Sequence, residues 1–188
     1  MPLKTGSPRG PTLRSQRLRL TWLLAFPFLY LSRPSAGVLL AGALISLSGL
    51  CLRARAAGFI LKDRELARGG PYGRLRHPLY LGTFLIGAGF SVAGGIWWFL
   101  VGYAGLFVWM SRRTIRAEEA YLVRRFGEDY ESYRDRVPSL VPRFGRHSGG
   151  THPQYFRCRL YRRNKEWQAA LGTLIGYLLL WARMSWPV

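Results

Sequence analysis

Two long stretches of this chain are almost free of charged side chains. The stretch from Leu79 to Met110 contains none, and the stretch from Leu20 to Leu52 contains only Arg33. A helix needs about 20 apolar residues to span a bilayer, so each stretch is too long for one spanning helix and rather short for two. A tight helical hairpin suits each length. We therefore expect an all-α integral membrane protein with two transmembrane helical hairpins.

Basic residues lie in blocks between the apolar stretches. Of the 28 Lys and Arg, 26 fall before Leu20, between Arg53 and Arg76, or between Arg112 and Lys165. A nucleic-acid-binding protein normally spreads such residues over a soluble basic face, whereas short cytoplasmic loops of membrane proteins collect them. Two hairpins place all three blocks on one side of the membrane. We therefore expect no nucleic-acid partner, a cytoplasmic N-terminus and polar chemistry on the cytoplasmic side.

The chain divides into three parts by composition. Residues 1–19 are basic and rich in proline, which suits an arm held near anionic lipid headgroups. Residues 20–146 form the expected membrane core. Residues 147–188 combine a basic tail with an apolar run from Trp167 to Ala182, which is short for a full span and is expected to be a transmembrane or interfacial helix. Cys51 and Cys158 have no paired spacing, so neither a disulfide framework nor a zinc site is expected.

The junction from Gly69 to Gly82 joins a basic loop to the second apolar stretch. Its glycines and Pro71 interrupt any helix, and Pro78 suits the first turn of a new one, where a missing amide hydrogen costs little. That helix is expected to turn near Gly94-Gly95-Ile96 and to return through Met110 into the cytoplasm as far as Phe126. Gly127 is a natural stop signal. The following segment, with Tyr130 and Tyr133, is expected to fold back against the membrane-proximal surface.

Ionisable groups at the edge of a membrane are costly, which makes them candidates for function. His77 stands at the expected helix start, where an imidazole serves as a hydrogen-bond donor, a base, a ligand or simply a helix cap. Glu118 and Glu119 lie about two turns beyond the apolar run, and adjacent side chains point about 100° apart on a helix. At most one of them is therefore expected to face a given ligand. A surface pair between Arg116 and Glu119 is the structural alternative.

Several short motifs around these residues occur in a fixed order. Together they resemble the integral-membrane methyltransferases of the isoprenylcysteine carboxyl methyltransferase and phospholipid methyltransferase group. The motifs are Gly70-Pro71-Tyr72, Arg76-His77-Pro78-Leu79-Tyr80-Leu81-Gly82, Glu118-Glu119, Leu122, Phe126-Gly127, Tyr130, Tyr133 and Val137-Pro138.

The resemblance implies a cytoplasmic S-adenosylmethionine site. It implies that Arg76 or His77 holds the cofactor carboxylate, and that Glu118 or Glu119 holds its ammonium or ribose. The expected cofactor-binding set is Tyr72, Arg76, His77, Pro78, Tyr80, Gly82, Glu118 and Glu119, with the adenine lying against Tyr72, Tyr80 or a tryptophan at the membrane edge.

The resemblance also implies a catalytic set of Arg53, His77 and Glu119. In the carboxyl-methylating branch an arginine ends the preceding helix, and Leu52-Arg53 is similar to that position. A guanidinium there would orient a carboxylate through paired hydrogen bonds. The expected activity is methyl transfer to a lipophilic or prenylated substrate among membrane lipids, most simply carboxyl O-methylation.

Three other functions stay open at this point. One is N-methylation of a phospholipid or another amine. The second is a non-catalytic membrane scaffold whose basic tail binds anionic lipid or a partner. The third is a membrane reductase with a similar helical core, although the chain has no Gly-x-Gly-x-x-Gly fingerprint for a nucleotide site. The sequence decides neither the acceptor nor the oligomeric state.

Overall fold

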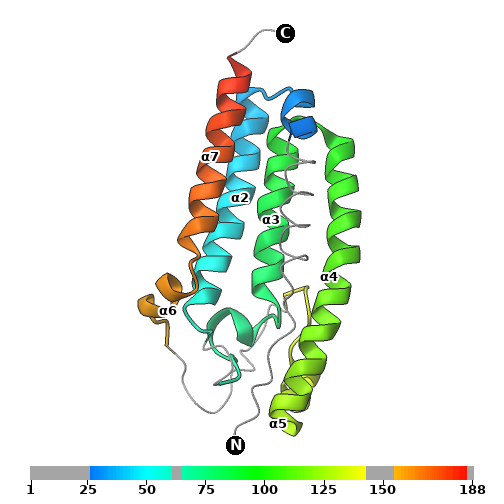
Figure 1. The fold of residues 1–188 in the computed structure, drawn as a ribbon, viewed down its shortest axis with the longest axis vertical. Helices are drawn as coiled ribbons and strands as arrows, with labels where there is room; N and C mark the ends of the chain where they lie inside the picture. Colours follow the sequence, from blue (N-terminus) through cyan, green and yellow to red (C-terminus); the bar gives the residue numbers. More distant parts are fainter. Residues whose placement is uncertain (1–25, 61–64, 143–154, 186–188) are drawn as a thin grey trace, which may run out of the picture.

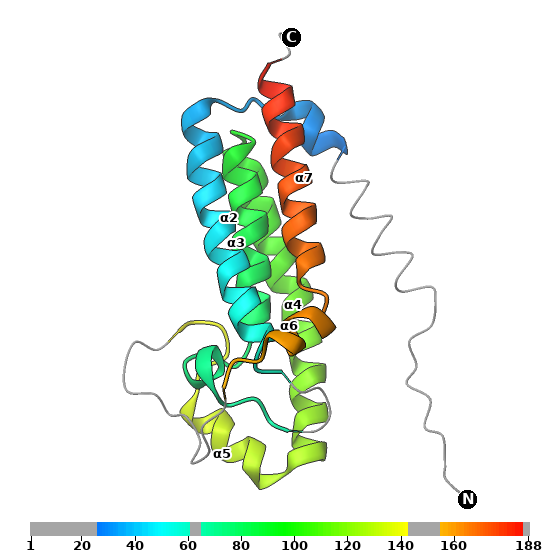
Figure 2. The same ribbon diagram turned by 90° about the vertical axis from the view of Figure 1, so that its left-hand side faces the viewer.

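A computed structural model describes residues 26–60, 65–142 and 155–185, and this part of the chain is all-helical. Four long helices lie side by side, with η1, α5 and α6 at one end of them and the short helical segment of residues 26–31 at the other (Figures 1 and 2). The elements are α2 (Ala36–Ala57), η1 (Gly70–Gly73), α3 (Pro78–Ala93), α4 (Trp97–Phe126), α5 (Glu128–Arg136), α6 (Cys158–Arg163) and α7 (Trp167–Met184).

The all-α prediction is confirmed. Among the described residues α2 alone has the length and apolar composition of a membrane-crossing helix, and α3 is apolar over 16 residues.

The first expected hairpin is described only in part. Residues 26–31 are helical, residues 32–35 form the break between the two arms, and Leu20 to Ala25 of the first arm lie outside the described residues. The second arm, α2, continues to Ala57 rather than ending at Leu52, so Arg53 and Arg55 lie within the helix. Arginine is a good helix former, which explains why the charge does not end the helix. Between α2 and η1, residues 58–60 and 65–69 are not helical, and residues 61–64 lie outside the described residues.

The second hairpin has the predicted boundaries. Pro78 is the first residue of α3, and α3 and α4 are joined by Gly94, Gly95 and Ile96. Gly95 has a φ of +70°, a backbone conformation that favours glycine. The second arm continues without a break to Phe126, and Gly127 ends it. The backbone N–H of Arg33 donates to the Gly94 oxygen at 2.9 Å, which joins the turns of the two hairpins.

Small residues let α2 and α3 approach closely. A Cβ added at Gly49 would lie 2.6 Å from the Gly82 oxygen, and one added at Gly89 would lie 2.5 Å from the Gly42 oxygen. Ser46 lies in the same contact and donates to the Ile86 oxygen at 3.1 Å. Lipid tails are as apolar as the surfaces of membrane helices, so the hydrophobic effect does not drive such helices together. Small residues instead let their backbones come into close contact. This packing brings the α2 end that carries Arg53 against the start of α3.

Gly42→Ala is expected to destabilise the protein, because the added Cβ would lie 2.6 Å from Ala93 Cβ and 2.7 Å from the Ala93 nitrogen. Overpacking of this kind costs about 1–3 kcal/mol. Gly37→Ala is the matched control, since it lies in the same helix with nothing within 4 Å of the added atom. Thermal unfolding in detergent should show a lower midpoint for Gly42→Ala alone. Equal midpoints for the two variants would contradict the tight α2–α3 crossing.

The C-terminal part of the chain docks along α2. Tyr177 of α7 shares a 2.9 Å hydrogen bond with Ser46 and stacks on Phe90 of α3, with ring centroids 4.8 Å apart. Near α6, Asn164 Nδ2 donates to the Ala57 oxygen at 2.9 Å, which fixes the start of the docked segment. The sequence did not predict α6. The expected apolar helix is present as α7, two residues longer than predicted at its C-terminal end.

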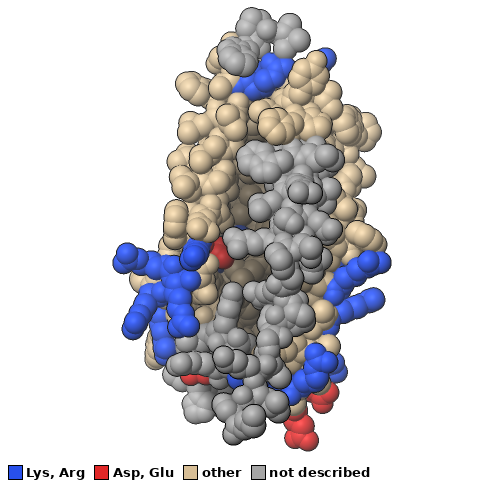
Figure 3. Space-filling model, in the orientation of Figure 1, with Lys and Arg blue, Asp and Glu red and all other residues tan. Residues whose placement is uncertain are grey.

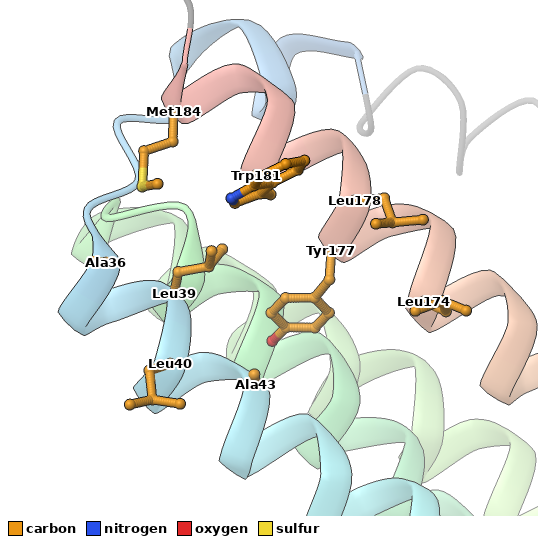
Figure 4. A pocket seen from close by; sticks show the side chains of 9 residues that line it. All are labelled: Ala36, Leu39, Leu40, Ala43, Leu174, Tyr177, Leu178, Trp181 and Met184. Carbon is orange, nitrogen blue, oxygen red and sulfur yellow. The ribbon is translucent and has the colours of Figure 1, made fainter.

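An apolar hollow of about 450 Å³ lies between the first turns of α2 and the last turns of α7 (Figure 4). It faces the end of the bundle opposite η1 and α5 (Figure 1). Its lining residues are Ala36, Leu39, Leu40, Ala43, Leu174, Tyr177, Leu178, Trp181 and Met184.

Candidate active site

The segment after α5 holds the backbone on which the candidate residues stand. Arg76 N–H donates to the Pro138 oxygen at 2.9 Å, and His77 N–H donates to the Ser139 oxygen at 3.2 Å. These bonds fix the chain immediately before α3 begins. The direction in which the Arg76 and His77 side chains leave the backbone is therefore set by contact with residues some sixty positions later in the sequence.

Helix α5 folds back on the end of α4. Tyr130, Tyr133 and Val137 are buried and pack against Leu66, Leu122, Val123 and Phe126. The Tyr133 hydroxyl donates a buried hydrogen bond to the backbone oxygen of Tyr72 at 2.8 Å, and this bond joins α5 to η1. Burial raises the pKa of Tyr133, so this hydroxyl keeps its proton as a donor. The fold-back therefore closes one side of the site.

Glu119 of α4 meets Arg76 and His77 at the start of α3. One carboxylate oxygen, Oε1, lies 2.9 Å from Arg76 Nη1 and 3.0 Å from His77 Nε2. The three side chains are 22%, 13% and 4% exposed respectively. The hairpin thus brings together residues 42 positions apart into one half-enclosed charged cluster. Their juxtaposition is as the sequence predicts, while their binding roles stay predictions.

Glu119 does not form the alternative surface pair with Arg116. Its carboxylate lies against Arg76 and His77, and Arg116 is exposed. Glu118 is also exposed, in keeping with the different faces that adjacent residues occupy on a helix. Of the two glutamates, Glu119 therefore belongs to the enclosed cluster.

Two groups at this cluster have buried polar atoms that make no hydrogen bond of good geometry among the described residues. They are the Arg76 guanidinium, through Nε and Nη1, and the Tyr130 hydroxyl. Arg76 Nη1 is within ion-pair distance of Glu119, but the contact lacks the geometry of a hydrogen bond. Burial raises the pKa of Tyr130, the Glu119 charge raises it further, and Arg76 lowers it. Arg76 and Tyr130 lie close enough to interact with each other, and guanidinium and phenol groups are donors that fit a carboxylate.

Tyr72 of η1 is buried, and its backbone oxygen accepts the hydrogen bond from Tyr133. Burial raises the pKa of Tyr72 well above its usual value, and Tyr133, Glu118 and Glu166 raise it further, whereas Arg53 lowers it. The Tyr72 phenol is therefore within electrostatic reach of residues from α2, α4 and the start of α7.

The second ion pair joins Arg53 to Glu166. Arg53 Nε donates to Glu166 Oε2 at 2.9 Å, and Nη2 donates to Oε1 at 3.0 Å, which is a bidentate pair. Arg53 Nη1 donates to the Leu79 oxygen at 3.4 Å and to Thr83 Oγ1. Because Leu79 is two residues after His77, Arg53 is positioned at the same end of α3 as the first cluster.

The remaining predicted residues surround His77 or pack the helices. Pro78 is buried as the first residue of α3. The Tyr80 ring stands edge-on to the His77 ring, with centroids 5.7 Å apart. A Cβ at Gly82 would lie 2.5 Å from Arg53 Cγ and 2.8 Å from the Gly49 oxygen, so close packing on α2 explains this glycine.

Sequence reasoning missed Glu166. It is the only acidic residue after Asp135, and it stands directly before the apolar run that begins at Trp167. A single acid in a strongly basic segment, at the start of an apolar helix, is a signal that would have identified it. Its partner Arg53 is 113 residues away and could not be assigned without the docking of α7.

The geometry defines a helical protein with a charged, partly enclosed site at one end of its bundle, and comparison with known proteins gives its family. A profile described as phospholipid methyltransferase matches residues 36–129. The chain belongs to this family, whose members use S-adenosylmethionine as the methyl donor.

Two curated relatives carry methyltransferase names. The chain is 33% identical over 128 residues to Protein-S-isoprenylcysteine O-methyltransferase of Schizosaccharomyces pombe, which covers 65% of this chain and 54% of that protein. It is 36% identical over 83 residues to Methanethiol S-methyltransferase of Crocosphaera subtropica, which covers 41% of this chain and 29% of that protein. The match thus spans about half of the first relative and less of the second. No solved structure matches.

Proposed function

We propose that this chain transfers a methyl group from S-adenosylmethionine to the carboxyl group of a lipophilic acceptor at the membrane interface. The observation that carries the proposal is the cluster of Arg76, His77 and Glu119, with the buried Tyr130 hydroxyl beside it. The family supplies the cofactor class, and the cluster supplies charged groups of the types that this cofactor requires.

The residues fit the polar parts of the cofactor. Arg76 Nε and the Tyr130 hydroxyl would donate to its carboxylate, and Glu119 would accept from its ammonium or its ribose hydroxyls. His77, held by Glu119, would keep the cofactor carboxylate oriented. The rings of Tyr72 and Tyr80 would flank the adenine. When bound, S-adenosylmethionine would supply an electrophilic methyl group. The acceptor oxygen would form a bond to the methyl carbon while the carbon–sulfur bond breaks, and the electron pair of the broken bond would stay on sulfur.

Arg53 supports a carboxyl acceptor. Its guanidinium already binds one carboxylate bidentately, that of Glu166, which shows that its geometry suits this group. A carboxylate is deprotonated at neutral pH, so no general base is needed. An amine would have to lose a proton, and the imidazole of His77 is engaged with Glu119. The main tasks of the chain are then to align the two reactants and to exclude water.

The distribution of charge supports a cytoplasmic site. Figure 3 shows Lys and Arg gathered in the half of the molecule that holds α6 and the C-terminal half of α4, while the flanks of the other half are largely uncharged. Short cytoplasmic segments collect basic residues. We propose that α2, α3, α7 and the first half of α4 lie in the membrane and that η1, α5 and the charged cluster face the cytoplasm.

Calorimetry and methyl transfer with the full chain in lipid nanodiscs test this proposal. S-adenosylmethionine should bind and NADPH should not. With a labelled methyl donor, N-acetyl-S-farnesylcysteine should acquire label that base releases as methanol, the behaviour of a methyl ester. Vesicles of phosphatidylethanolamine and an alkanethiol provide the amine and thiol comparisons.

Each alternative has its own outcome in that assay. Base-stable label in phosphatidylethanolamine alone would replace the carboxyl acceptor by an amine, and label in the thiol alone would replace it by sulfur. NADPH binding in place of S-adenosylmethionine binding would indicate a reductase. Binding of neither nucleotide, with salt-dependent association to anionic vesicles, would indicate a scaffold.

A further inference from the structure

Glu166 comes from a part of the chain that lies outside the residues matched by the family profile. The profile ends at residue 129, whereas Glu166 directly precedes α7. Its side chain is 9% exposed, so its charge is largely removed from solvent. A buried carboxylate of this kind requires a partner, and Arg53 of α2 is that partner. The C-terminal segment therefore adds a carboxylate to the site that the family core forms.

The donors of Arg53 divide into two sets. Nη1 donates to the Leu79 oxygen and to Thr83 Oγ1, both on α3, while Nε and Nη2 both donate to Glu166. The edge formed by Nε and Nη2 is the one that binds a carboxylate in a bidentate manner. Any acceptor carboxylate that binds this edge must therefore replace Glu166.

The contacts allow that replacement without movement of the helices. The backbone around Glu166 is held by the hydrogen bond from Asn164 to Ala57, and α7 is held by the bond between Tyr177 and Ser46. On the other side, Leu79 and Thr83 keep the guanidinium in place through Nη1. Rotation of the Glu166 side chain alone would free the bidentate edge.

We infer that Glu166 is a specificity-determining residue that competes with the acceptor carboxylate for Arg53. This inference rests on the carboxyl acceptor proposed above. A small soluble carboxylate can form with Arg53 only the bidentate pair that Glu166 already forms. It must also compete with the high local concentration of Glu166, which is part of the same chain. A carboxylate on a lipophilic chain gains additional binding free energy by burying that chain. Glu166 therefore weakens the binding of every carboxylate at Arg53 by the same factor, so that only a carboxylate with this additional binding free energy still binds appreciably.

Glu166→Gln tests this inference, because glutamine keeps the size and one acceptor oxygen but removes the competing charge. Binding is measured by calorimetry with the full chain in nanodiscs, using N-acetyl-S-farnesylcysteine, its carboxamide and acetate. The variant should bind the carboxylate probe at least tenfold more tightly and the carboxamide unchanged. Acetate should inhibit probe binding to the variant at concentrations that leave the wild type unaffected.

Two controls separate competition from misfolding. Glu131→Gln removes an exposed acid on α5 and should leave every affinity unchanged. Binding of S-adenosylmethionine to Glu166→Gln should equal that of the wild type, which shows that the first cluster is intact. Glu166→Asp keeps the charge on a shorter side chain and should give an intermediate affinity for the carboxylate probe.

Unchanged or weaker binding of the carboxylate probe by folded Glu166→Gln would overturn the inference, as would an equal gain for the carboxamide. Failure of the proposed function looks different. If Glu166→Gln binds the carboxylate probe more tightly but neither protein methylates it, Glu166 still competes at Arg53 and the proposed reaction is wrong.

Discussion

Glu119→Gln is expected to weaken binding of S-adenosylmethionine by about 10- to 100-fold, which corresponds to the loss of one hydrogen bond to a charged group. The substitution keeps the size of the side chain but removes the charge that Arg76 Nη1 and His77 Nε2 share. It also leaves the buried Arg76 guanidinium without its counter-ion. Both the contact to the cofactor and the orientation of its neighbours are then lost.

Calorimetry with S-adenosylmethionine measures this effect, and Glu118→Gln is the informative comparison. Glu118 is adjacent in sequence but exposed, so its substitution should change the affinity by less than about threefold, as for an exposed charge. His77→Ala should also weaken binding, since it removes the ring that Glu119 contacts. Full affinity in both Glu119→Gln and His77→Ala, with the proteins folded, would remove the proposed cofactor site.

The parts of the fold predicted correctly depend on local signals. Pro78, the glycines before Trp97 and Gly127 fix the ends of α3 and α4, because proline and glycine act on the backbone wherever the rest of the chain lies. The lengths of the uncharged stretches then require a hairpin. That hairpin returns α4 beside α3, which is why His77 and Glu119 could be predicted to meet.

The parts that were missed depend on contacts distant in sequence. The helix propensity of Arg53 permits α2 to continue past it, but nothing local indicates that Glu166 and Thr83 bind its guanidinium. Nothing local to Glu119 shows that it prefers Arg76, since Arg116 is closer in sequence and equally basic. In both cases the tertiary fold offers an enclosed partner, and a partly desolvated pair interacts more strongly than an exposed one. The sequence therefore indicates which residues are charged but not how they pair.

Arg53→Met is expected to destabilise the protein by about 3–5 kcal/mol, because it leaves the Glu166 carboxylate buried without a counter-ion. The double variant Arg53→Met/Glu166→Leu should recover most of that loss, since replacing both members of a buried pair by apolar residues is often close to neutral. Unfolding of the wild type, the double variant and both single variants in the same detergent gives the coupling free energy of the pair. Single-variant losses that simply add would contradict a coupled buried pair.

The double variant also separates the structural role of Arg53 from its proposed role in catalysis. Once stability is restored, S-adenosylmethionine should still bind, because Arg76, His77 and Glu119 are unchanged. Methyl transfer to N-acetyl-S-farnesylcysteine should nevertheless be lost, because the carboxylate has no guanidinium to orient it. If the stable double variant methylates this probe with the KM of the wild type, Arg53 does not bind the acceptor. Its pairing with Glu166 would then serve only to hold α7 against the α2–α3 hairpin.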